Sequence, residues 1–394
     1  MRIRAWIGMI LVALLLASSS LAAPKIHVVE KGHSLWSIAR RYGVTVTALR
    51  ARNDLKKGDP LQIGQRLEIP PKDWKPDGSK PSRAKDDDKP RRSKKSEPDW
   101  VTAKPAPETQ TQKTVKERGV NPCNTPDPGW GTYTHWDRAP SIGQLILPER
   151  GGVTRGGGFD VMIHFHGHEP VRKEWVKVMS GTVLVGIDLG IGSGPYESTF
   201  RSPAAFKALL DSIEEAVKKH TGKKKVYIRK LGLSAWSAGY GAVESILRIP
   251  EYAKMVDSVV LLDGLHSATT EPMKSKQLEP FVDFAKQASR RRKFMFVSHS
   301  SIIPPGYAST TETVHYLINE LRGKPRKARA RKSDPMGLEL IDRYDRGFFH
   351  ARGYSGNDKM DHCAHIGLYK DVLKVHIRRR WNSPRGYGAR RSKK

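Results

Sequence analysis

The stretch that decides the fold reads Lys230-Leu231-Gly232-Leu233-Ser234-Ala235-Trp236-Ser237-Ala238-Gly239-Tyr240-Gly241. An apolar strand runs into Ser237, and the small residues Ala235 and Gly239 flank that serine two positions away on either side. A strand that turns sharply into a helix leaves no room for large side chains beside the turn, and it presents the turn hydroxyl at a helix N-terminus that favours negative charge. The pattern predicts a nucleophilic serine at a strand-to-helix elbow. The alternative is a buried serine on an ordinary turn.

From Gly119 onward, apolar strands alternate with amphipathic helices, which is typical of an α/β fold with a mainly parallel sheet. We expect one such domain over residues 119–382. Besides the strand before Ser237, the expected strands are residues 159–166, 182–187, 258–262, 293–297 and 338–349. The expected helices, besides the one after the elbow, are residues 202–221, 278–289, 311–321 and 366–380.

In strand order this region resembles the α/β-hydrolase fold, a resemblance that covers residues 119–382. Members of that family place a serine, an acid and a histidine in that chain order. Their histidine lies in a loop just before the last helix, where this sequence has Asp361-His362-Cys363-Ala364-His365. The resemblance therefore implies that His362 is the base, with His365 as the second candidate.

The acid is expected at Asp263, directly after the strand 258–262. The family more often carries its acid after the following strand, but here that strand ends in Ser298-His299-Ser300 without a carboxylate. A minority of the family places the acid where Asp263 stands, and a carboxylate there could reach the same imidazole. The other candidates are Asp342, Asp345 and Asp361.

The sequence His164-Phe165-His166-Gly167-His168 ends an expected strand at the place where related hydrolases carry a His-Gly motif. By resemblance, the backbone N–H groups of Gly167 or His168 and of Ala238 would stabilise the oxyanion of the transition state. A rival interpretation is a zinc site built from the three histidines, since alternating histidines can bind zinc. Only Glu169 follows as the acidic ligand that such sites require, so we expect no bound metal and no cofactor.

The N-terminus has the pattern of an export signal over residues 1–22. Arg2 and Arg4 precede an apolar run that is too short to span a bilayer comfortably, and Ser20-Leu21-Ala22 supplies small residues for cleavage. A short membrane anchor is the alternative. We expect an exported protein with no transmembrane segment after removal of the signal, in the periplasm, at the cell wall or secreted.

Residues 25–70 show a strand, two short helices and a closing strand in order. The run from Val28-Val29-Glu30-Lys31-Gly32 to Gly64-Gln65-Arg66-Leu67-Glu68-Ile69-Pro70 resembles a LysM module along its whole length. That family binds N-acetylglucosamine chains of peptidoglycan or chitin. The positions that the resemblance implicates in glycan binding are Gly32, His33, Ser34, Leu61, Gln62 and Ile63. A LysM fold that binds no glycan is the alternative.

Residues 71–118 are rich in Pro, Lys, Asp, Ser and Thr, and predict a disordered basic linker. The net charge of +30 is concentrated in segments that look unfolded, namely residues 80–95, 324–332 and the basic tail 383–394. In an exported protein, such charge favours anionic polymers of the cell envelope as partners. No nucleic-acid-binding motif accompanies it, so we expect no nucleic acid partner.

The chain has two cysteines, Cys123 and Cys363, and export would place them where disulfides persist. We expect one bridge between them, with two buried thiols as the alternative. Together the motifs predict an exported serine hydrolase, an esterase, deacetylase or related acyl hydrolase, targeted to the cell wall by its LysM module. A wall-binding protein with an inactive hydrolase fold and a zinc-dependent peptidoglycan amidase are the competing hypotheses.

Overall fold

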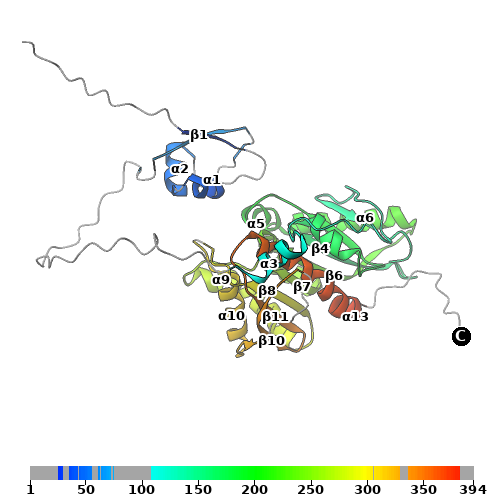
Figure 1. Ribbon diagram of the computed structural model, residues 1–394. Helices are drawn as coiled ribbons and strands as arrows, with labels where there is room; N and C mark the ends of the chain where they lie inside the picture. The colour runs from blue at the N-terminus through cyan, green and yellow to red at the C-terminus, as the bar shows by residue number, and fades with distance from the viewer. Residues whose placement is uncertain are drawn as a thin grey trace, which may run out of the picture. The chain divides into compact units, whose positions relative to one another are not determined.

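The computed structural model describes residues 25–29, 35–42, 44–55, 61–62, 64–71, 74, 108–304, 306–328 and 336–381 (Figure 1). The chain divides into two compact units, residues 1–96 and 97–394. The predicted signal peptide, most of the predicted linker and the basic tail lie outside the described residues. Within the described part, no helix combines the length and the apolar character that crossing a bilayer requires.

The first unit has the predicted order of elements. Strand β1 (Lys25–Val28) is followed by helices α1 (Leu35–Tyr42) and α2 (Val46–Arg52) and by strand β2 (Arg66–Ile69). The two strands pair antiparallel, with Lys25 opposite Ile69. The βααβ arrangement expected from the sequence is therefore confirmed.

The helices of this unit are held to its small sheet by an apolar core and by one polar side chain. Leu49 of α2 and Leu67 of β2 are fully buried in that core. The Asn53 amide donates to the carbonyls of Leu49 and Glu68, and its oxygen accepts from the Glu68 N–H at 2.7 Å. Asn53 thereby links the end of α2 to the closing strand.

The second unit is built on a nine-stranded, mainly parallel sheet. Its strand order is β3-β5-β4-β6-β7-β8-β11-β10-β9, and the six strands from β5 to β11 in that order run parallel. The strand bounds are β3 Gln144–Ile146, β4 Gly158–Phe165, β5 Val183–Ile187, β6 Tyr227–Trp236, β7 Val256–Leu262, β8 Phe294–Ser300, β9 Arg326–Lys327, β10 Leu340–Arg346 and β11 Phe349–Tyr354. The α/β class and the mainly parallel sheet expected from the sequence are confirmed.

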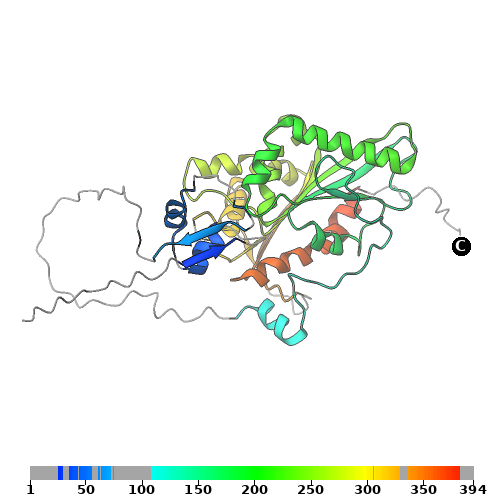
Figure 2. The same cartoon turned by 90° about the horizontal axis from the view of Figure 1, so that it is seen from above.

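Helices cover both faces of this sheet, because parallel strands must be joined by crossovers that pack on its faces (Figure 2). One face carries α5 to α10, and the other carries α4 and α11 to α13. The helix bounds are α4 His168–Trp175, α5 Gly194–Phe200, α6 Pro203–Thr221, α7 Tyr240–Leu247, α8 Pro250–Met255, α9 Met273–Ser289, α10 Thr310–Glu320, α11 Lys359–Ala364, α12 Leu368–Val372 and α13 Arg378–Trp381.

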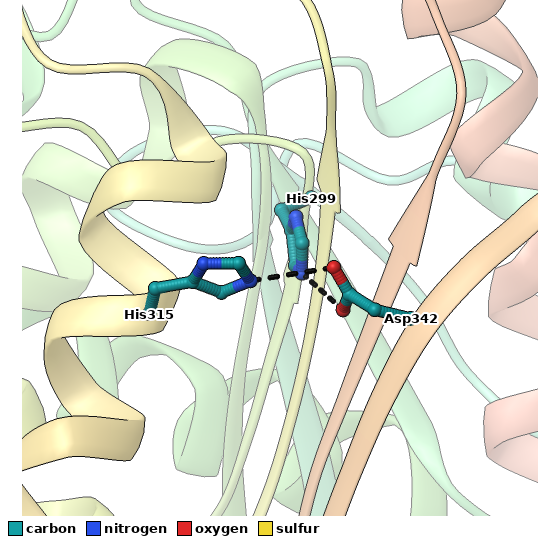
Figure 3. A group of neighbouring side chains, drawn as sticks. All are labelled: His299, His315 and Asp342. Atoms are coloured by element: carbon teal, nitrogen blue, oxygen red, sulfur yellow. Dashed lines mark hydrogen bonds and ion pairs between the residues drawn. The ribbon is translucent and has the colours of Figure 1, made fainter. Parts of the chain in front are cut away.

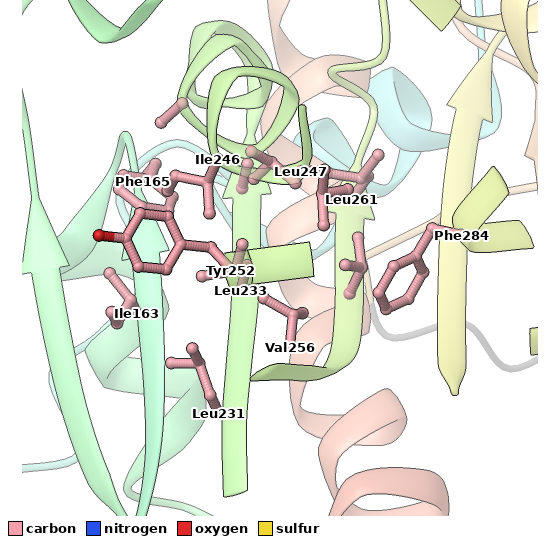
Figure 4. Close-up of a cluster of buried hydrophobic side chains, with 14 of the residues drawn as sticks. Ile163, Phe165, Leu231, Leu233, Ile246, Leu247, Tyr252, Val256, Leu261 and Phe284 are labelled. Carbon is pink, nitrogen blue, oxygen red and sulfur yellow. The ribbon is translucent and has the colours of Figure 1, made fainter. Parts of the chain in front are cut away.

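Successive residues of the central strands alternate between two hydrophobic cores. Ile163 and Phe165 of β4 and Leu231 and Leu233 of β6 point into the first core, beneath Ile246 of α7 (Figure 4). Residues one position out of phase, such as Met162, Val260 and Leu262, belong to the second core. Because the side-chain period of a strand is two, this continuous apolar pattern fixes a sheet buried on both faces.

The structure corrects the prediction of disorder between residues 108 and 118. Helix α3 (Gln110–Arg118) begins at Thr109, whose hydroxyl accepts from the Gln112 N–H. The same hydroxyl donates to the buried carboxylate of Asp361 at 2.8 Å. The composition predicted a disordered linker here because the residues of this helix are polar. Its order comes from a capping box and from contacts with α11, more than 240 residues away in the sequence.

The predicted bridge between Cys123 and Cys363 is present, with the two Cα atoms 5.0 Å apart. It joins the segment after α3 to α11, so two parts of the second unit that are 240 residues apart in the sequence are linked covalently.

Three other expectations needed correction. Residues 338–349 form not one strand but part of the antiparallel hairpin β10–β11. The expected unfolded segment 324–332 contains β9, which pairs with β10. The single closing helix 366–380 is a series of short α, 3₁₀ and π segments. Each error arose where pairing or packing with distant residues decides the local structure.

We expect replacement of both Cys123 and Cys363 by Ser to lower the free energy of unfolding by about 2–5 kcal/mol, because the bridge closes a very long loop. Urea denaturation followed by tryptophan fluorescence measures this change. Reductant added to the wild-type protein should lower its denaturation midpoint to that of the double variant. An unchanged midpoint in both experiments would contradict the prediction.

Candidate active site

Ser237 stands at a sharp turn between β6 and α7. The strand ends at Trp236, a 3₁₀ turn spans Ser237–Gly239, and α7 follows. Ser237 has φ of 51°, a left-handed conformation that a non-glycine residue adopts only when its surroundings impose it. A Cβ on Gly239 would lie 2.1 Å from the carbonyl oxygen of Phe165, so only glycine fits there. The elbow therefore packs directly against the end of β4.

Asp263 lies next to this elbow, at the end of the neighbouring strand β7. A Cβ on the following residue, Gly264, would lie 2.6 Å from the backbone nitrogen of Ser237, so the two strand ends touch. The Asp263 side chain is almost completely buried. The carboxyl ends of β6 and β7 thus bring a serine and a buried acid together.

The carboxylate of Asp263 contacts the imidazole of His362. The His362 Nδ1–H donates to Asp263 Oδ2 at 2.7 Å. His362 lies inside the short helix α11 rather than in a loop, because Asp358 and Asp361 form a capping box that begins the helix before it. With Nδ1 donating to the acid, the Nε2 of a neutral His362 carries a lone pair that can accept a proton.

Asp263 is held in its ionised form by a set of hydrogen-bond donors. Ser300 donates to it from its backbone N–H and from its hydroxyl, both at 2.9 Å, and Thr310 donates from its hydroxyl at 2.7 Å. Burial raises the pKa of this carboxyl, but nearby His365 and the bonds from His362 and Thr310 more than offset that effect and hold the pKa far below its usual range. Strand β8, which lacks an acid of its own, supplies the serine that holds Asp263.

Trp236, the residue before the serine, positions the histidine ring. Its indole N–H donates to the carbonyl of His362 at 3.1 Å, and its ring stacks on the His362 ring with centroids 4.8 Å apart. The ring of His166 also stacks on Trp236, with centroids 5.3 Å apart. Trp236 was not predicted as a site residue from the sequence. Its only signal was its place directly before the candidate nucleophile.

The competing base and one competing acid have other roles. His365 is fully buried, bonds through Nδ1 to the Ser298 hydroxyl at 2.8 Å, and has its pKa lowered to about 4 by burial. Asp361 is also fully buried, and its carboxylate accepts from Thr109 and from the backbone of Asn357. Both residues hold the α11 region in place.

The remaining acids pair with other histidines. Asp342 contacts His299 and His315, while Asp345 contacts His350 and Arg352. Of the four candidate acids, Asp263 is the one that bonds His362 in the described residues.

One expected oxyanion donor is already engaged. The Gly167 N–H donates to the carboxylate of Asp188 at 2.6 Å, so it is not available to an oxyanion. The same carboxylate contacts the ring of His168. Burial raises the pKa of Asp188, but the bonds from His168 and Gly167 outweigh burial and lower it to about 2. The N–H groups of His168, at the start of α4, and of Ala238, in the elbow turn, remain as candidates.

Asp188 was missed from the sequence, although it directly follows the strand that ends at Ile187. Asp263 was predicted because it directly follows an expected strand. Asp188 meets the same condition and could have been predicted in the same way.

The zinc interpretation of the histidines near the end of β4 does not agree with the geometry. His164 is buried, donates from Nε2 to the carbonyl of His166 at 2.8 Å, and accepts at Nδ1 from the Ser234 hydroxyl. Burial lowers its pKa to about 3. His166 stacks on Trp236 instead. Among the described residues, these histidines and Glu169 do not form a group of converging metal ligands.

In the first unit, four of the six expected glycan-binding positions, Gly32, His33, Ser34 and Ile63, lie outside the described residues. Leu61 packs against the core of that unit, and Gln62 is exposed. The roles of all six positions stay predictions.

Comparison with known proteins gives one family match and several distant structural similarities. Residues 27–70 match the model of the LysM domain. No curated protein matches the chain in sequence.

Three solved structures illustrate the distant similarities. A mutant of the feruloyl esterase module from Clostridium thermocellum, complexed with sinapinate, has 12% identity and a TM-score of 0.36 over 69% of this chain and 92% of its own. A thermostable esterase has 12% identity and a TM-score of 0.36 over 64% of each chain. The acylaminoacyl peptidase of Pyrococcus horikoshii has 12% identity and a TM-score of 0.37 over 66% of this chain and 43% of its own.

The family match and the βααβ structure agree on the first unit, so residues 27–70 form a LysM domain.

Proposed function

We propose that this chain is an exported serine hydrolase that cleaves ester or amide bonds of an acyl group, and that its LysM domain holds it at the cell wall. The observation that supports the hydrolase most directly is the hydrogen-bonded pair of Asp263 and His362 beside the strained Ser237. A serine hydroxyl is a poor nucleophile unless a base removes its proton and a third group orients that base. The three residues have the chemistry and chain order that this arrangement needs.

In the proposed reaction, His362 Nε2 takes the proton of the Ser237 hydroxyl while the serine oxygen attacks the substrate carbonyl. Asp263 accepts from Nδ1–H throughout and stabilises the imidazolium that forms. The N–H groups of Ala238 and His168 would stabilise the oxyanion. His362 then protonates the leaving group, and water releases the acyl group from Ser237 by the reverse sequence of proton transfers.

The rival hypothesis of an inactive hydrolase fold is less well supported. Burying an ionised carboxylate is unfavourable by several kcal/mol unless hydrogen bonds compensate it. Here Ser300, Thr310 and His362 all compensate Asp263. An arrangement that holds a charged acid against a part-exposed imidazole favours retained catalysis.

The LysM domain supports a location at the cell wall, since domains of this family bind peptidoglycan or other glycans that contain N-acetylglucosamine. The substrate is then an acyl group on or near the wall.

Replacing Ser237 by Ala should abolish covalent labelling by a fluorophosphonate probe and reduce hydrolysis of p-nitrophenyl acetate by roughly 10⁴-fold or more. Ser245→Ala is the matched control, because Ser245 lies on the following helix and its hydroxyl donates to the Glu197 carbonyl. Labelling of the Ser237→Ala protein, measured by in-gel fluorescence, would refute the assignment of the nucleophile.

Asp263→Asn should lower kcat by about 10⁴-fold, because the amide stabilises the wrong tautomer of His362. Asp345→Asn provides the control, since Asp345 pairs with a different histidine. Steady-state kinetics and circular dichroism separate the loss of activity from unfolding. Equal kinetics in the two variants would mean that Asp263 is not the acid.

Deleting residues 25–70 should abolish co-sedimentation with insoluble peptidoglycan and leave the hydrolysis of p-nitrophenyl acetate unchanged. The assay is run at about 1 M salt, where the Debye length is only about 3 Å and the basic segments no longer attract anionic polymers. If the shortened chain still sediments at that salt concentration, another part of the protein binds the wall.

A further inference from the structure

A second cluster of chemically capable side chains lies apart from the proposed catalytic residues. His299 at the end of β8, His315 on α10 and Asp342 on β10 converge in Figure 3. His299 Nε2 lies 3.2 Å from Asp342 Oδ1, and His315 Nε2 lies 3.3 Å from Asp342 Oδ2. All three ligand atoms lie within 4.8 Å of one another. The proposed hydrolytic reaction uses none of them.

These separations are short enough for one metal ion to contact all three residues. Ligand atoms at about 2.0–2.1 Å from zinc in a tetrahedral site are about 3.3 Å apart. The two histidine–carboxylate distances are close to that value, although each histidine faces a different oxygen of Asp342. Two imidazoles and one carboxylate form a nitrogen–oxygen donor set that suits Zn²⁺, with water as the fourth ligand.

The hydrogen bonds of His299 leave a lone pair facing the carboxylate. The Thr311 hydroxyl donates its only proton to the Ser300 carbonyl at 2.7 Å, so it must accept from His299 Nδ1–H at 2.9 Å. In a neutral His299, Nε2 is then an acceptor. An acceptor 3.2 Å from a carboxylate oxygen is repelled unless a proton or a cation lies between them. His299 is fully buried in this position.

Gly353 leaves room for the side chains of His299 and Asp342. A Cβ on Gly353 of β11 would lie 2.4 Å from His299 Cε1 and 2.6 Å from Asp342 Oδ1, so any larger residue would displace the ligands. The cluster is also accessible from solvent, because the His315 side chain is 33% exposed and that of Asp342 is 16% exposed. A metal ion and its water therefore have an entry path.

We propose that His299, His315 and Asp342 bind one Zn²⁺ ion with one position left to water, and that the ion ties α10 and β10 to the end of β8. The Thr311 hydroxyl orients His299 for coordination, as outer hydrogen bonds commonly do for metal-bound histidines. The ion would hold α10, whose first residue, Thr310, donates to Asp263. This site differs from the histidine string near β4 and from the sequence expectation of no bound metal, and it does not depend on the proposed hydrolase activity.

Binding is tested with the full chain, freed of any affinity tag and of metal, by competition for Zn²⁺ against a fluorescent chelator. The wild-type protein should bind one equivalent of Zn²⁺. The His315→Ala variant lacks a ligand, so it should bind no Zn²⁺ at this site or bind it at least about 10–100-fold more weakly. Thr311→Val should weaken Zn²⁺ binding by about 10–100-fold although all three ligands remain, because it removes the hydroxyl that orients His299. His350→Ala is the matched control. His350 also contacts an aspartate, but among the described residues no third metal-binding side chain joins that pair.

Thermal unfolding gives a second measurement that does not depend on the chelator. Zn²⁺ should raise the unfolding midpoint of the wild-type protein and of His350→Ala, and not that of His315→Ala, because a ligand that binds only the folded state stabilises it. Since His315 is part-exposed on a helix and alanine favours helices, this variant should remain folded, which circular dichroism checks. Equal Zn²⁺ affinity in the wild-type, His315→Ala and His350→Ala proteins would overturn the proposal, as would the absence of any bound equivalent in the wild-type protein.

Discussion

The structure around the candidate active site depends on keeping one buried carboxylate charged. Asp263 is almost inaccessible to water, and an ionised group in such a place is unfavourable by several kcal/mol unless it is hydrogen-bonded. The four hydrogen bonds of its carboxylate come from β8, α10 and α11, from residues that lie 37 to 99 positions after Asp263 in the sequence. The ends of these elements can therefore move little without exposing an uncompensated charge. That constraint fixes the position of the His362 ring more firmly than apolar contacts alone could do.

The parts of this arrangement that could be predicted from sequence are those written in short, local patterns. The elbow at Ser237 follows from small residues at fixed offsets, and Asp263 follows from its place directly after a strand. The LysM unit follows from a dense series of glycines and apolar positions. In each case the physical requirement acts over a few neighbouring residues, so the sequence records it directly.

What could not be predicted depends on contacts between distant residues. Helix α3 is polar, and its order comes from the bond between Thr109 and Asp361. The engagement of Gly167 by Asp188 could not be read from either residue alone, because two different strands bring them together. The same applies to the cluster of His299, His315 and Asp342, whose spacing along the chain matches no short motif. Sequence patterns identify such residues only after the topology is known.

The bridge between Cys123 and Cys363 and the hydrogen bond between Thr109 and Asp361 affect the order in which the second unit folds. Both contacts join the first described residues of the second unit to α11, near its end, at sequence separations of 240 and 252 residues. Contacts of such long range form late, since loop closure over so many residues must precede them. His362 lies between the two residues of α11 that make these contacts. The imidazole thus reaches its place only after α11 has been synthesised, so the contact between His362 and Asp263 cannot form in any shorter chain.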